Sequence, residues 1–332
     1  MKGIVRRLAH IFLTNSIKIL SLLLAVSILS FALVSASPVD PVQQYILELG
    51  AAVSPEQRME IEAYWGVQEP PVERYLTWLS ELLHGNLGES LIYRRPVADI
   101  IGERFLNSLA LMLCAWMLAG VIGFSCGCIM GMYKDKAPDK IIKKICYILS
   151  SVPTFWLGLV FLLIFSVWLG WFPIGFSTPV GVTSANVTIF EKIYHLILPA
   201  FTLSLMSFSN IALHTRQKLI DVWNSEYVLF AHARGEGDWT ILRRHGFRNI
   251  LLPALTLQFA SFAELFGGSV MAENVFSYPG LGSAVSAAGL NGDVPLLLGI
   301  TLFSALFVCV GNMIANLLYG VVDPQIREVN EL

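Results

Sequence analysis

The sequence predicts an all-α integral membrane protein with six transmembrane helices. First, 55% of the 332 residues are hydrophobic and only 14% are charged, whereas soluble domains carry about 25% charged residues. Second, six apolar runs are each long enough to cross a bilayer as a helix. Third, lysine and arginine gather in alternate connecting segments, as in multi-pass membrane proteins. The six runs are 17–34, 106–132, 145–169, 193–213, 250–271 and 294–322.

The first apolar run, Ile17–Val34, follows a short basic segment that contains Lys2, Arg6 and Arg7. Together with Val34-Ser35-Ala36, this pattern also fits a cleaved secretory signal. The run of about 18 residues is longer than the usual core of a signal and is sufficient to span. We therefore expect residues 1–34 to be a cytoplasmic N-terminus and a retained first helix, which N-terminal sequencing of the mature protein would test.

Residues 35–105 are predicted to form a small helical subdomain outside the membrane. They contain eleven Asp or Glu, five Arg and no Lys. Helical patterns occur around 55–65 and 71–83, on either side of Pro70-Pro71, because proline is tolerated where a helix begins. The segment 85–88, Gly-Asn-Leu-Gly, predicts a turn at the end of the subdomain.

The five remaining spans are expected to form a transmembrane core over 106–322. Gly123, Gly127 and Gly131 recur every four residues, and such a stripe of small residues lets a neighbouring helix approach closely. Prolines fall in the third, fourth and fifth spans, at positions 153, 199 and 253.

The charge pattern predicts the orientation. The N-terminal segment has four Lys or Arg, the 133–144 loop has five lysines, and 214–249 has six Lys or Arg. The alternate loops, 170–192 and 272–293, have one and none. The positive-inside rule places both termini, including the tail 323–332, in the cytoplasm together with 214–249.

The 214–249 segment is far longer than a simple connection requires, and its pattern predicts a helix, a break and a second helix. Residues 226–234 can continue the fourth span inward, and Gly235-Glu236-Gly237-Asp238 ends that helix. Asp238 is a candidate N-cap for a short helix, 239–245, along the membrane surface, and Asn249 for the next span. The residues alone fit either a projecting docking element or a basic loop that only anchors topology.

Several blocks of sequence resemble the permeases of binding-protein-dependent ABC importers, in the dipeptide/oligopeptide/nickel branch. The segment from Glu226-Tyr227-Val228 to Leu252-Pro253 resembles their EAA loop. The other blocks occur in the same order as in the B-type permease of that branch. They are SPEQ at 54–57, YLTWL at 75–79, GNLGES at 85–90, RPV at 95–97, SSVPTFWLG at 150–158, ENVFSYPGLG at 273–282 and DPQIR at 323–327.

The resemblance implies a type I ABC importer permease of the bacterial cytoplasmic membrane, with a coupling helix that contacts an ATPase. It implies two cytoplasmic ATPase subunits, a second permease of the C type and an extracytoplasmic substrate-binding protein as partners. The residues it assigns to ATPase coupling are Glu226, Ala231, Ala233, Arg234, Gly235, Gly237, Asp238 and Trp239. Peptides, nickel or metal chelates and similar small solutes are the substrates it implies.

ATP hydrolysis is not expected in this chain. The sequence has no Gly-x-x-x-x-Gly-Lys-Ser/Thr phosphate loop, so ATP and Mg²⁺ are expected on the partner ATPases and no cofactor in this chain. The sequence also departs from the branch at Asn291-Gly292-Asp293, where an arginine usually precedes the aspartate. This change removes a positive charge near the predicted outer mouth and weakens the assumption of a plain peptide substrate.

Three polar residues are candidates for the translocation pathway. Glu264 lies past the middle of the fifth span, and intramembrane carboxylates usually face a polar pathway or a partner. It could attract a cationic substrate group, or be protonated or hydrogen-bonded to a neighbouring helix. Asn210 and Glu273 are the other two, and for Asn210 and nearby His214 a helix–helix hydrogen bond is favoured over a pathway role.

Other function classes have less support in the sequence. His195, His232 and His245 have no metal-ligand spacing and are expected to be solvated or interfacial, and the five cysteines suggest no disulfide framework. The net charge of −2 favours no nucleic-acid partner. An ion-gradient-driven secondary transporter is the main alternative, but the two halves of the chain lack matching broken helices.

Overall fold

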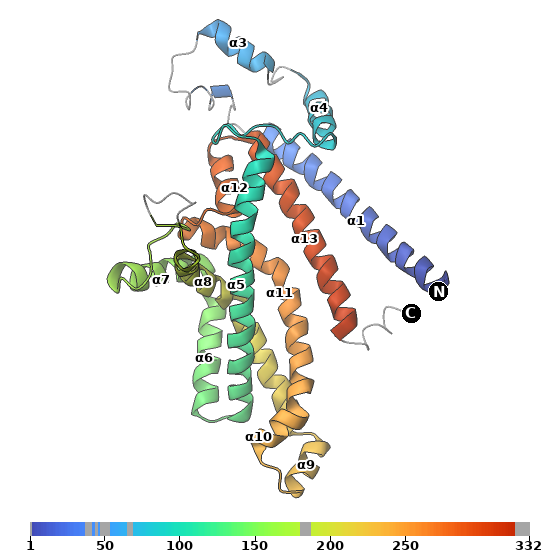
Figure 1. Cartoon of the computed structure of the whole chain (residues 1–332), viewed down its shortest axis with the longest axis vertical. Helices are drawn as coiled ribbons and strands as arrows, with labels where there is room; N and C mark the ends of the chain where they lie inside the picture. Colours follow the sequence, from blue (N-terminus) through green and yellow to red (C-terminus); the bar gives the residue numbers. More distant parts are fainter. Residues whose placement is uncertain are drawn as a thin grey trace. The chain divides into compact units, whose positions relative to one another are not determined.

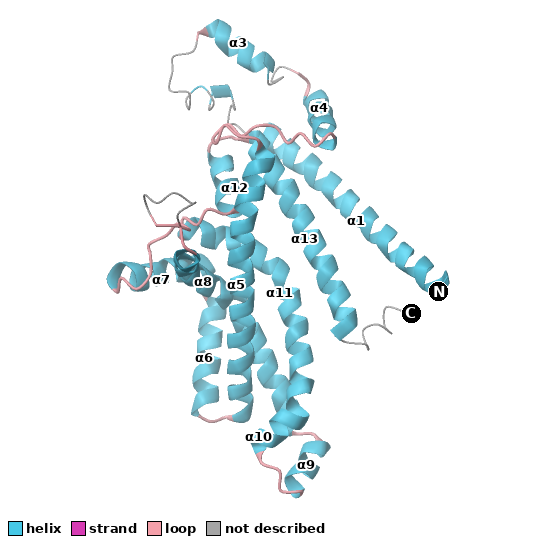
Figure 2. Ribbon diagram, in the orientation of Figure 1, coloured by secondary structure: helices cyan, strands magenta, loops and turns pink. Residues whose placement is uncertain are grey.

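The computed structural model describes residues 2–36, 42, 43, 46, 54–64, 69–179 and 187–322. The tail 323–332 and most of 37–53 therefore lie outside the described residues. All the elements in the described part are helical, and no strand occurs there (Figures 1 and 2). They are α1 Lys2–Ser35, α3 Pro55–Tyr64, α4 Pro71–Leu83, α5 Val97–Met132, α6 Ala137–Ser151, α7 Thr154–Phe161 with the π-helical segment η1 Leu162–Trp168, α8 Ile189–Trp223, α9 Glu226–Ala233, α10 Asp238–Ile241 with η3 Leu242–Gly246, α11 Phe247–Val275, α12 Leu281–Leu290 and α13 Val294–Val322.

The chain divides into two compact units. Unit 1 comprises 1–106 and 280–310, and unit 2 comprises 107–279 and 311–332. The first turns of α5 and the first half of α13 therefore belong to a different unit from the rest of those helices. The predicted 35–105 subdomain ends inside α5, which begins at Val97.

In unit 1, α4 packs against the end of α1. Phe31 is buried and its ring meets Tyr75 edge-on, with centroids 5.4 Å apart. The hydroxyls of Ser27 and Tyr75 are 2.8 Å apart and share a hydrogen bond. The predicted helix at 71–83 is confirmed, with Pro71 at its first position.

A second apolar core of unit 1 joins the start of α5 to α12 and α13. Its buried members are Val97, Ile100, Ile101, Leu281, Ala284, Ala288, Leu296 and Ile300. Above this core, the buried carboxylate of Asp293 holds the segment that precedes α5. Asp293 Oδ2 accepts from the Ser90 hydroxyl (2.5 Å) and the Ile92 amide (3.2 Å), while Oδ1 accepts from the Leu296 amide (3.1 Å) and so caps α13.

Unit 2 is built around α8, which is the most buried of its long helices. In the most apolar part of α8, 67% of the residues are buried, against 28% in the corresponding part of α5. The glycine stripe of α5 faces α8. A Cβ added at Gly127 would lie 2.5 Å from Thr215 Cβ, and one at Gly131 would lie 2.7 Å from Leu219 Cδ2. The predicted close helix approach is therefore confirmed, and α8 is the neighbour.

The helix α5 also contacts α11 in unit 2. The Trp116 indole donates to the Gln258 carbonyl at 2.7 Å, and the Gln258 side-chain amide donates back to the Trp116 carbonyl. A Cβ at Gly120 would collide with the Gln258 side chain at 2.9 Å. Glycine at this position therefore makes room for a polar link between two membrane helices.

The predicted spans are confirmed as helical, but two are bent. Four described helices are long and apolar enough to cross a membrane, and six if each bent pair is one span. The chain turns by 109° between α6 and α7, at Pro153, whose ring restricts the residue before it to extended conformations. The second bend, of 56°, falls inside α11. The helix α12 was not predicted, because its small apolar residues were assigned to a loop.

Candidate functional site

The 214–249 segment folds as a helix–turn–helix at the end of unit 2 that also contains the turn between α5 and α6 (Figure 1). The helix α8 stops at Trp223, and α9 is a separate helix rather than a continuation of α8. The predicted break is confirmed at Gly235, whose φ of +83° lies in the region that glycine adopts without steric cost.

Two predicted helix caps are wrong. Gly237 occupies the N-cap of α10 with φ −79° and ψ 156°, and Asp238 is the first helical residue, where its carboxylate is favourable near the positive end of the helix. The predicted short helix at 239–245 does not stand alone, since α10 and η3 run directly into α11. Asn249 lies inside α11 and donates to the Tyr227 hydroxyl and the His245 carbonyl, both at 3.0 Å.

A buried apolar cluster fixes α9 to its neighbours. Val228 is 1% exposed and Ala231 is 5% exposed. Both pack with buried residues from α8, α10, η3 and α11: Leu219, Val222, Ile241, Leu242 and Ile250. Because cores of this kind are close-packed and transmit displacement, α9 is mechanically linked to the end of α8 and the start of α11.

Charged groups surround the turn without forming close hydrogen bonds. His232 Nε2 lies 3.8 Å from Asp238 Oδ1, and Arg234 Nη2 lies 3.9 Å from Glu236 Oε1. His245 Nε2 is 3.6 Å from Glu236 Oε2. The imidazole of His232 also stacks on Trp223, with ring centroids 6.3 Å apart. The turn is closed by backbone hydrogen bonds, from the Gly235 amide to the His232 carbonyl (2.9 Å) and from the Glu236 amide to the Ala231 carbonyl (3.1 Å), and the charged side chains add only loose contacts.

Three large apolar side chains stand out from this helix–turn–helix. Leu229 and Phe230 on α9 are each 70% exposed, and Trp239 on α10 is 67% exposed. We call these three residues the apolar tip. A cluster of exposed large apolar residues beside polar groups is typical of a protein-interaction site.

The residues predicted for coupling are brought together here. Ala231 is buried beneath the tip, whereas Glu226, Ala233, Arg234, Gly235, Gly237, Asp238 and Trp239 are exposed on it or beside it. Leu229 and Phe230 were not predicted as part of this site. The available signal was a pair of large apolar residues close to charged residues in the polar segment between the fourth and fifth predicted spans.

The candidate pathway residues do not share one environment. Glu264 on α11 and Asn210 on α8 are exposed, and Glu264 forms no hydrogen bond or ion pair with a described residue. Glu273 is fully buried, and its Oε1 accepts a hydrogen bond from the Ser108 hydroxyl of α5 at 2.6 Å. Glu273 therefore joins two helices, and only Glu264 and Asn210 are open to a pathway or a partner.

The prediction for His195 is also corrected. Its side chain was expected to be solvated or interfacial, but it is 8% exposed and its Nδ1 lies 3.0 Å from the Gly175 carbonyl and 3.1 Å from that of Phe176. His232 is exposed and His245 half-buried.

A buried ion pair in unit 2 was also missed. The Arg216 guanidinium donates to both oxygens of the Asp139 carboxylate, at 2.6 and 2.7 Å, and so joins α8 to the first turn of α6. Nothing in the sequence pairs these two residues, which are 77 positions apart.

The sequence is similar to those of known transport permeases. The profile of the binding-protein-dependent transport system inner membrane component family matches residues 123–328. The chain is 34% identical over 323 residues to the oligopeptide transport system permease protein AppB of Bacillus subtilis (strain 168), covering 96% of this chain and all of that protein. It is 33% identical to a putative peptide transport system permease protein of Brucella abortus (strain 2308), over 92% of this chain and 95% of the relative.

The glutathione transport system permease protein GsiC of Escherichia coli O6:H1 is 32% identical, over 92% of this chain and 94% of that protein. These relatives are permease components of transport systems and not catalytic subunits. The chain belongs to the binding-protein-dependent transport system inner membrane component family. The predicted resemblance to the peptide branch of ABC importer permeases is thereby confirmed.

Proposed function

We propose that this chain is one of two permease subunits of an ATP-driven importer that moves peptides into the cytoplasm. The observation that carries the proposal is the apolar tip, Leu229, Phe230 and Trp239, exposed on a helix–turn–helix that a buried cluster fixes to two membrane helices. The tip lies within the segment that matches the family.

The tip is the surface that a cytoplasmic ATPase contacts. Closure of two ATPase subunits on ATP and Mg²⁺ pushes α9 and α10, and the cluster around Val228 and Ala231 passes that displacement to α8 and α11. Arg234, with its side chain 78% exposed, is available to pair with a carboxylate of the ATPase. This chain transmits the displacement to the membrane helices, while the ATPase subunits hydrolyse ATP.

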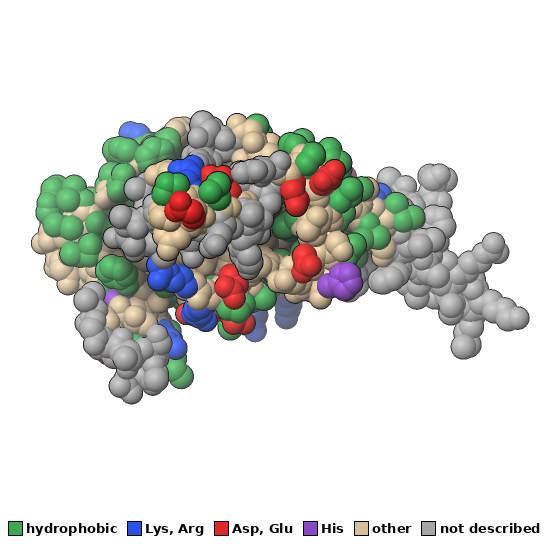
Figure 3. Space-filling model, turned by 90° about the horizontal axis from the view of Figure 1, so that it is seen from above, with side chains coloured by type: hydrophobic (Ala, Val, Ile, Leu, Met, Phe, Trp, Pro, Cys, Tyr) green, Lys and Arg blue, Asp and Glu red, His purple; other side chains and the backbone are tan. Residues whose placement is uncertain are grey.

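The proposed orientation places both termini and the apolar tip in the cytoplasm, in agreement with the lysine and arginine distribution. Unit 1 then presents its acidic segment to the outside, where the substrate-binding protein docks. The exposed carboxylates of this segment belong to Glu56, Glu69, Glu73, Glu81, Glu89, Asp99 and Glu103. Figure 3 shows acidic side chains among hydrophobic ones on the face seen from above.

Peptides are the proposed substrate class because the relatives' names include oligopeptide, peptide and glutathione transport. Nickel and metal chelates are also among the substrates that the resemblance to the dipeptide/oligopeptide/nickel branch implies. Glu264 is exposed within a span, and a carboxylate facing lipid would be costly. Its carboxylate therefore faces the pathway or the second permease, and in the pathway it favours a cationic group such as a peptide amine.

The test is uptake by proteoliposomes that contain the two permeases, the two ATPases and the binding protein. We expect peptide uptake that requires ATP and Mg²⁺ and stops when the ATPase subunits are omitted. A Trp239→Ala, Phe230→Ala double variant is expected to lose ATPase association while both permeases remain inserted. A matched control is Leu76→Ala, Leu83→Ala, which removes two apolar side chains, 57% and 78% exposed, from α4 in unit 1.

Uptake that continues without ATPase subunits and follows an ion gradient would contradict the proposal and support a secondary transporter. Retention of the ATPases by the double variant would show that the apolar tip is not their contact.

A further inference from the structure

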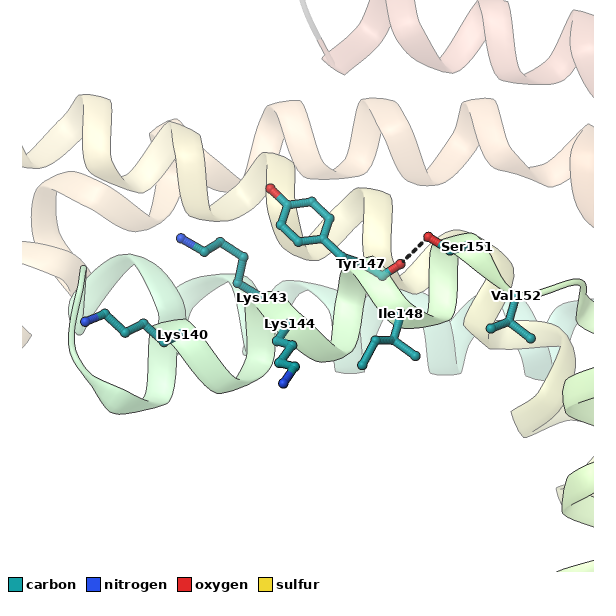
Figure 4. A pocket seen from close by; sticks show the side chains of 7 residues that line it. All are labelled: Lys140, Lys143, Lys144, Tyr147, Ile148, Ser151 and Val152. Atoms are coloured by element: carbon teal, nitrogen blue, oxygen red, sulfur yellow. Dashed lines mark hydrogen bonds between the residues drawn. The ribbon is translucent and has the colours of Figure 1, made fainter.

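The helix α6 carries a hollow on its surface that the transport mechanism does not use (Figure 4). Its volume of about 470 Å³ lies in the range of small-molecule sites, so it has room for more than a single ion. All the lining residues come from one stretch of the chain: Lys140, Lys143, Lys144, Tyr147, Ile148, Ser151 and Val152.

The positive charge of this hollow is not neutralised by the described residues. None of the three lysines forms an ion pair there. The nearest carboxylate in the helix, Asp139, is fully buried and both its oxygens are bound by Arg216, at 2.6 and 2.7 Å. Asp139 Oδ2 also accepts from the Asp135 amide at 2.8 Å. The hydrogen-bonding capacity of Asp139 is therefore taken up by Arg216 and the Asp135 amide rather than by these lysines.

The chemistry of the hollow changes along its length. The lysines occupy the first turns of α6, whereas Tyr147, Ile148 and Val152 follow toward the other end of the helix, as the labelled side chains in Figure 4 show. At about 1.5 Å per residue, the hollow extends roughly 18 Å from Lys140 to Val152. Tyr147 and Ile148 are 57% and 52% exposed. A basic end followed by an apolar stretch is complementary to an anionic amphiphile, which has a negative headgroup and an apolar chain.

The neighbourhood of the hollow also favours lipid over a protein partner. Ile141 and Ile145 on the same helix are 59% and 45% exposed, so apolar side chains border the lysines rather than more polar groups. The turn before α6 lies at the same end of unit 2 as α9 and α10 (Figure 1). In the proposed orientation this end is cytoplasmic, where basic side chains beside a membrane helix attract anionic headgroups.

We propose that Lys140, Lys143, Lys144 and Tyr147 form a binding site for the phosphate headgroup of an anionic phospholipid, with one acyl chain along Ile148 and Val152. The choice of leaflet rests on the proposed orientation, whereas the site itself does not. The bound lipid would shield the apolar side chains of α6 from water and hold the N-terminal half of this helix at a fixed depth in the membrane.

The test measures binding of fluorescent phosphatidylglycerol to the purified permease pair in phosphatidylcholine nanodiscs. The variant is Lys140→Gln, Lys143→Gln, Lys144→Gln. The matched control, Arg94→Gln, Arg95→Gln, Lys192→Gln, removes three exposed cations elsewhere. We expect the lysine variant to bind phosphatidylglycerol roughly tenfold more weakly, because each basic side chain adds to the attraction, and the control to bind normally. Replacement of the three lysines by arginine should retain binding.

Three results would overturn the proposal. The first is unchanged phosphatidylglycerol binding by the lysine variant, with its folding verified by an unchanged melting temperature. The second is lysine-dependent binding that inorganic phosphate displaces as well as phosphatidylglycerol does, which indicates a site for free phosphate. The third is loss of ATPase association with lipid binding intact, which indicates a protein contact. Lipid binding is measured without transport, so its failure is distinguishable from failure of the importer function.

Discussion

The Arg216 guanidinium binds both carboxylate oxygens of Asp139 and joins the C-terminal part of α8 to the first turn of α6. The Asp139 side chain is fully buried and that of Arg216 is 13% exposed. A two-point contact of this kind is specific to arginine, since lysine presents a single point charge. The pair therefore fixes the position of α6 relative to the helix that leads into α9.

We predict that Asp139→Asn destabilises unit 2 by about 3 kcal/mol, because removing one partner leaves a buried charge uncompensated. Arg216→Lys should cost less, since the charge is kept and one hydrogen bond is lost. Thermal unfolding of the purified permease pair measures both. The control is Arg95→Lys, whose pair with Glu103 is 53% and 61% exposed and contributes little. Equal melting temperatures for Asp139→Asn and the parent would contradict this role.

A second prediction concerns the contact between α5 and α8. Gly127→Val places a Cβ 2.5 Å from Thr215 Cβ and 2.7 Å from the Ala212 carbonyl, so the two helices must separate. We expect destabilisation of about 1–3 kcal/mol, read as a lower melting temperature. Gly102→Ala is the control on the same helix, because a Cβ there meets nothing within 4 Å and alanine favours the helix.

The sequence was sufficient to predict much of this architecture. Apolar run length and charge placement identified the helices, and the four-residue spacing of Gly123 and Gly127 predicted the close helix approach without naming α8 as the neighbour. The break at Gly235 was predictable because few residues other than glycine end a helix in that conformation.

The remaining features depend on tertiary contacts that leave no local pattern. Asp139 and Arg216 are 77 residues apart, and Ser90 and Asp293 are 203 apart. The 109° turn at Pro153 was read as a proline within one span, because proline at an early helical position is also compatible with a straight helix. Burial of Glu273 depends on Ser108, on another helix, and the sequence does not show which carboxylate has such a donor.

A third prediction concerns the segment before α5. Asp293→Ala removes the acceptor for the Ser90 hydroxyl and the Ile92 amide, and the cap of α13. We expect faster proteolytic cleavage of the Arg94–Arg95 bond, measured by limited trypsin digestion of inverted and right-side-out vesicles, because trypsin does not cut the next bond, Arg95–Pro96. Cleavage in right-side-out vesicles alone would also support the proposed orientation. Asn291→Ala is the control, since its side chain bonds only within its own helix turn, to the Ala287 carbonyl.

A fourth prediction addresses Glu264. If its exposed carboxylate lines the pathway, Glu264→Gln should lower uptake of peptides with a cationic end several-fold relative to N-acetylated peptides. Competition between the two substrates in the reconstituted importer measures this ratio. Glu73→Gln, an exposed carboxylate in α4 outside the proposed pathway, serves as the control. An unchanged ratio would assign Glu264 to a contact with the second permease.

The turn at Gly235 supports the sharpest prediction about coupling. Gly235 and Gly237 are both exposed, and a Cβ at either meets nothing within 4 Å, so the two positions do not differ in the space around the first side-chain atom. Only Gly235 has a positive φ, +83°, whereas Gly237 has φ −79°. Valine is strongly disfavoured at positive φ and tolerated in an extended conformation. Gly235→Val should therefore distort the turn and uncouple ATP hydrolysis from peptide uptake, while Gly237→Val keeps the ratio of the two rates near that of the parent. If both variants stay coupled, displacement does not pass through this turn.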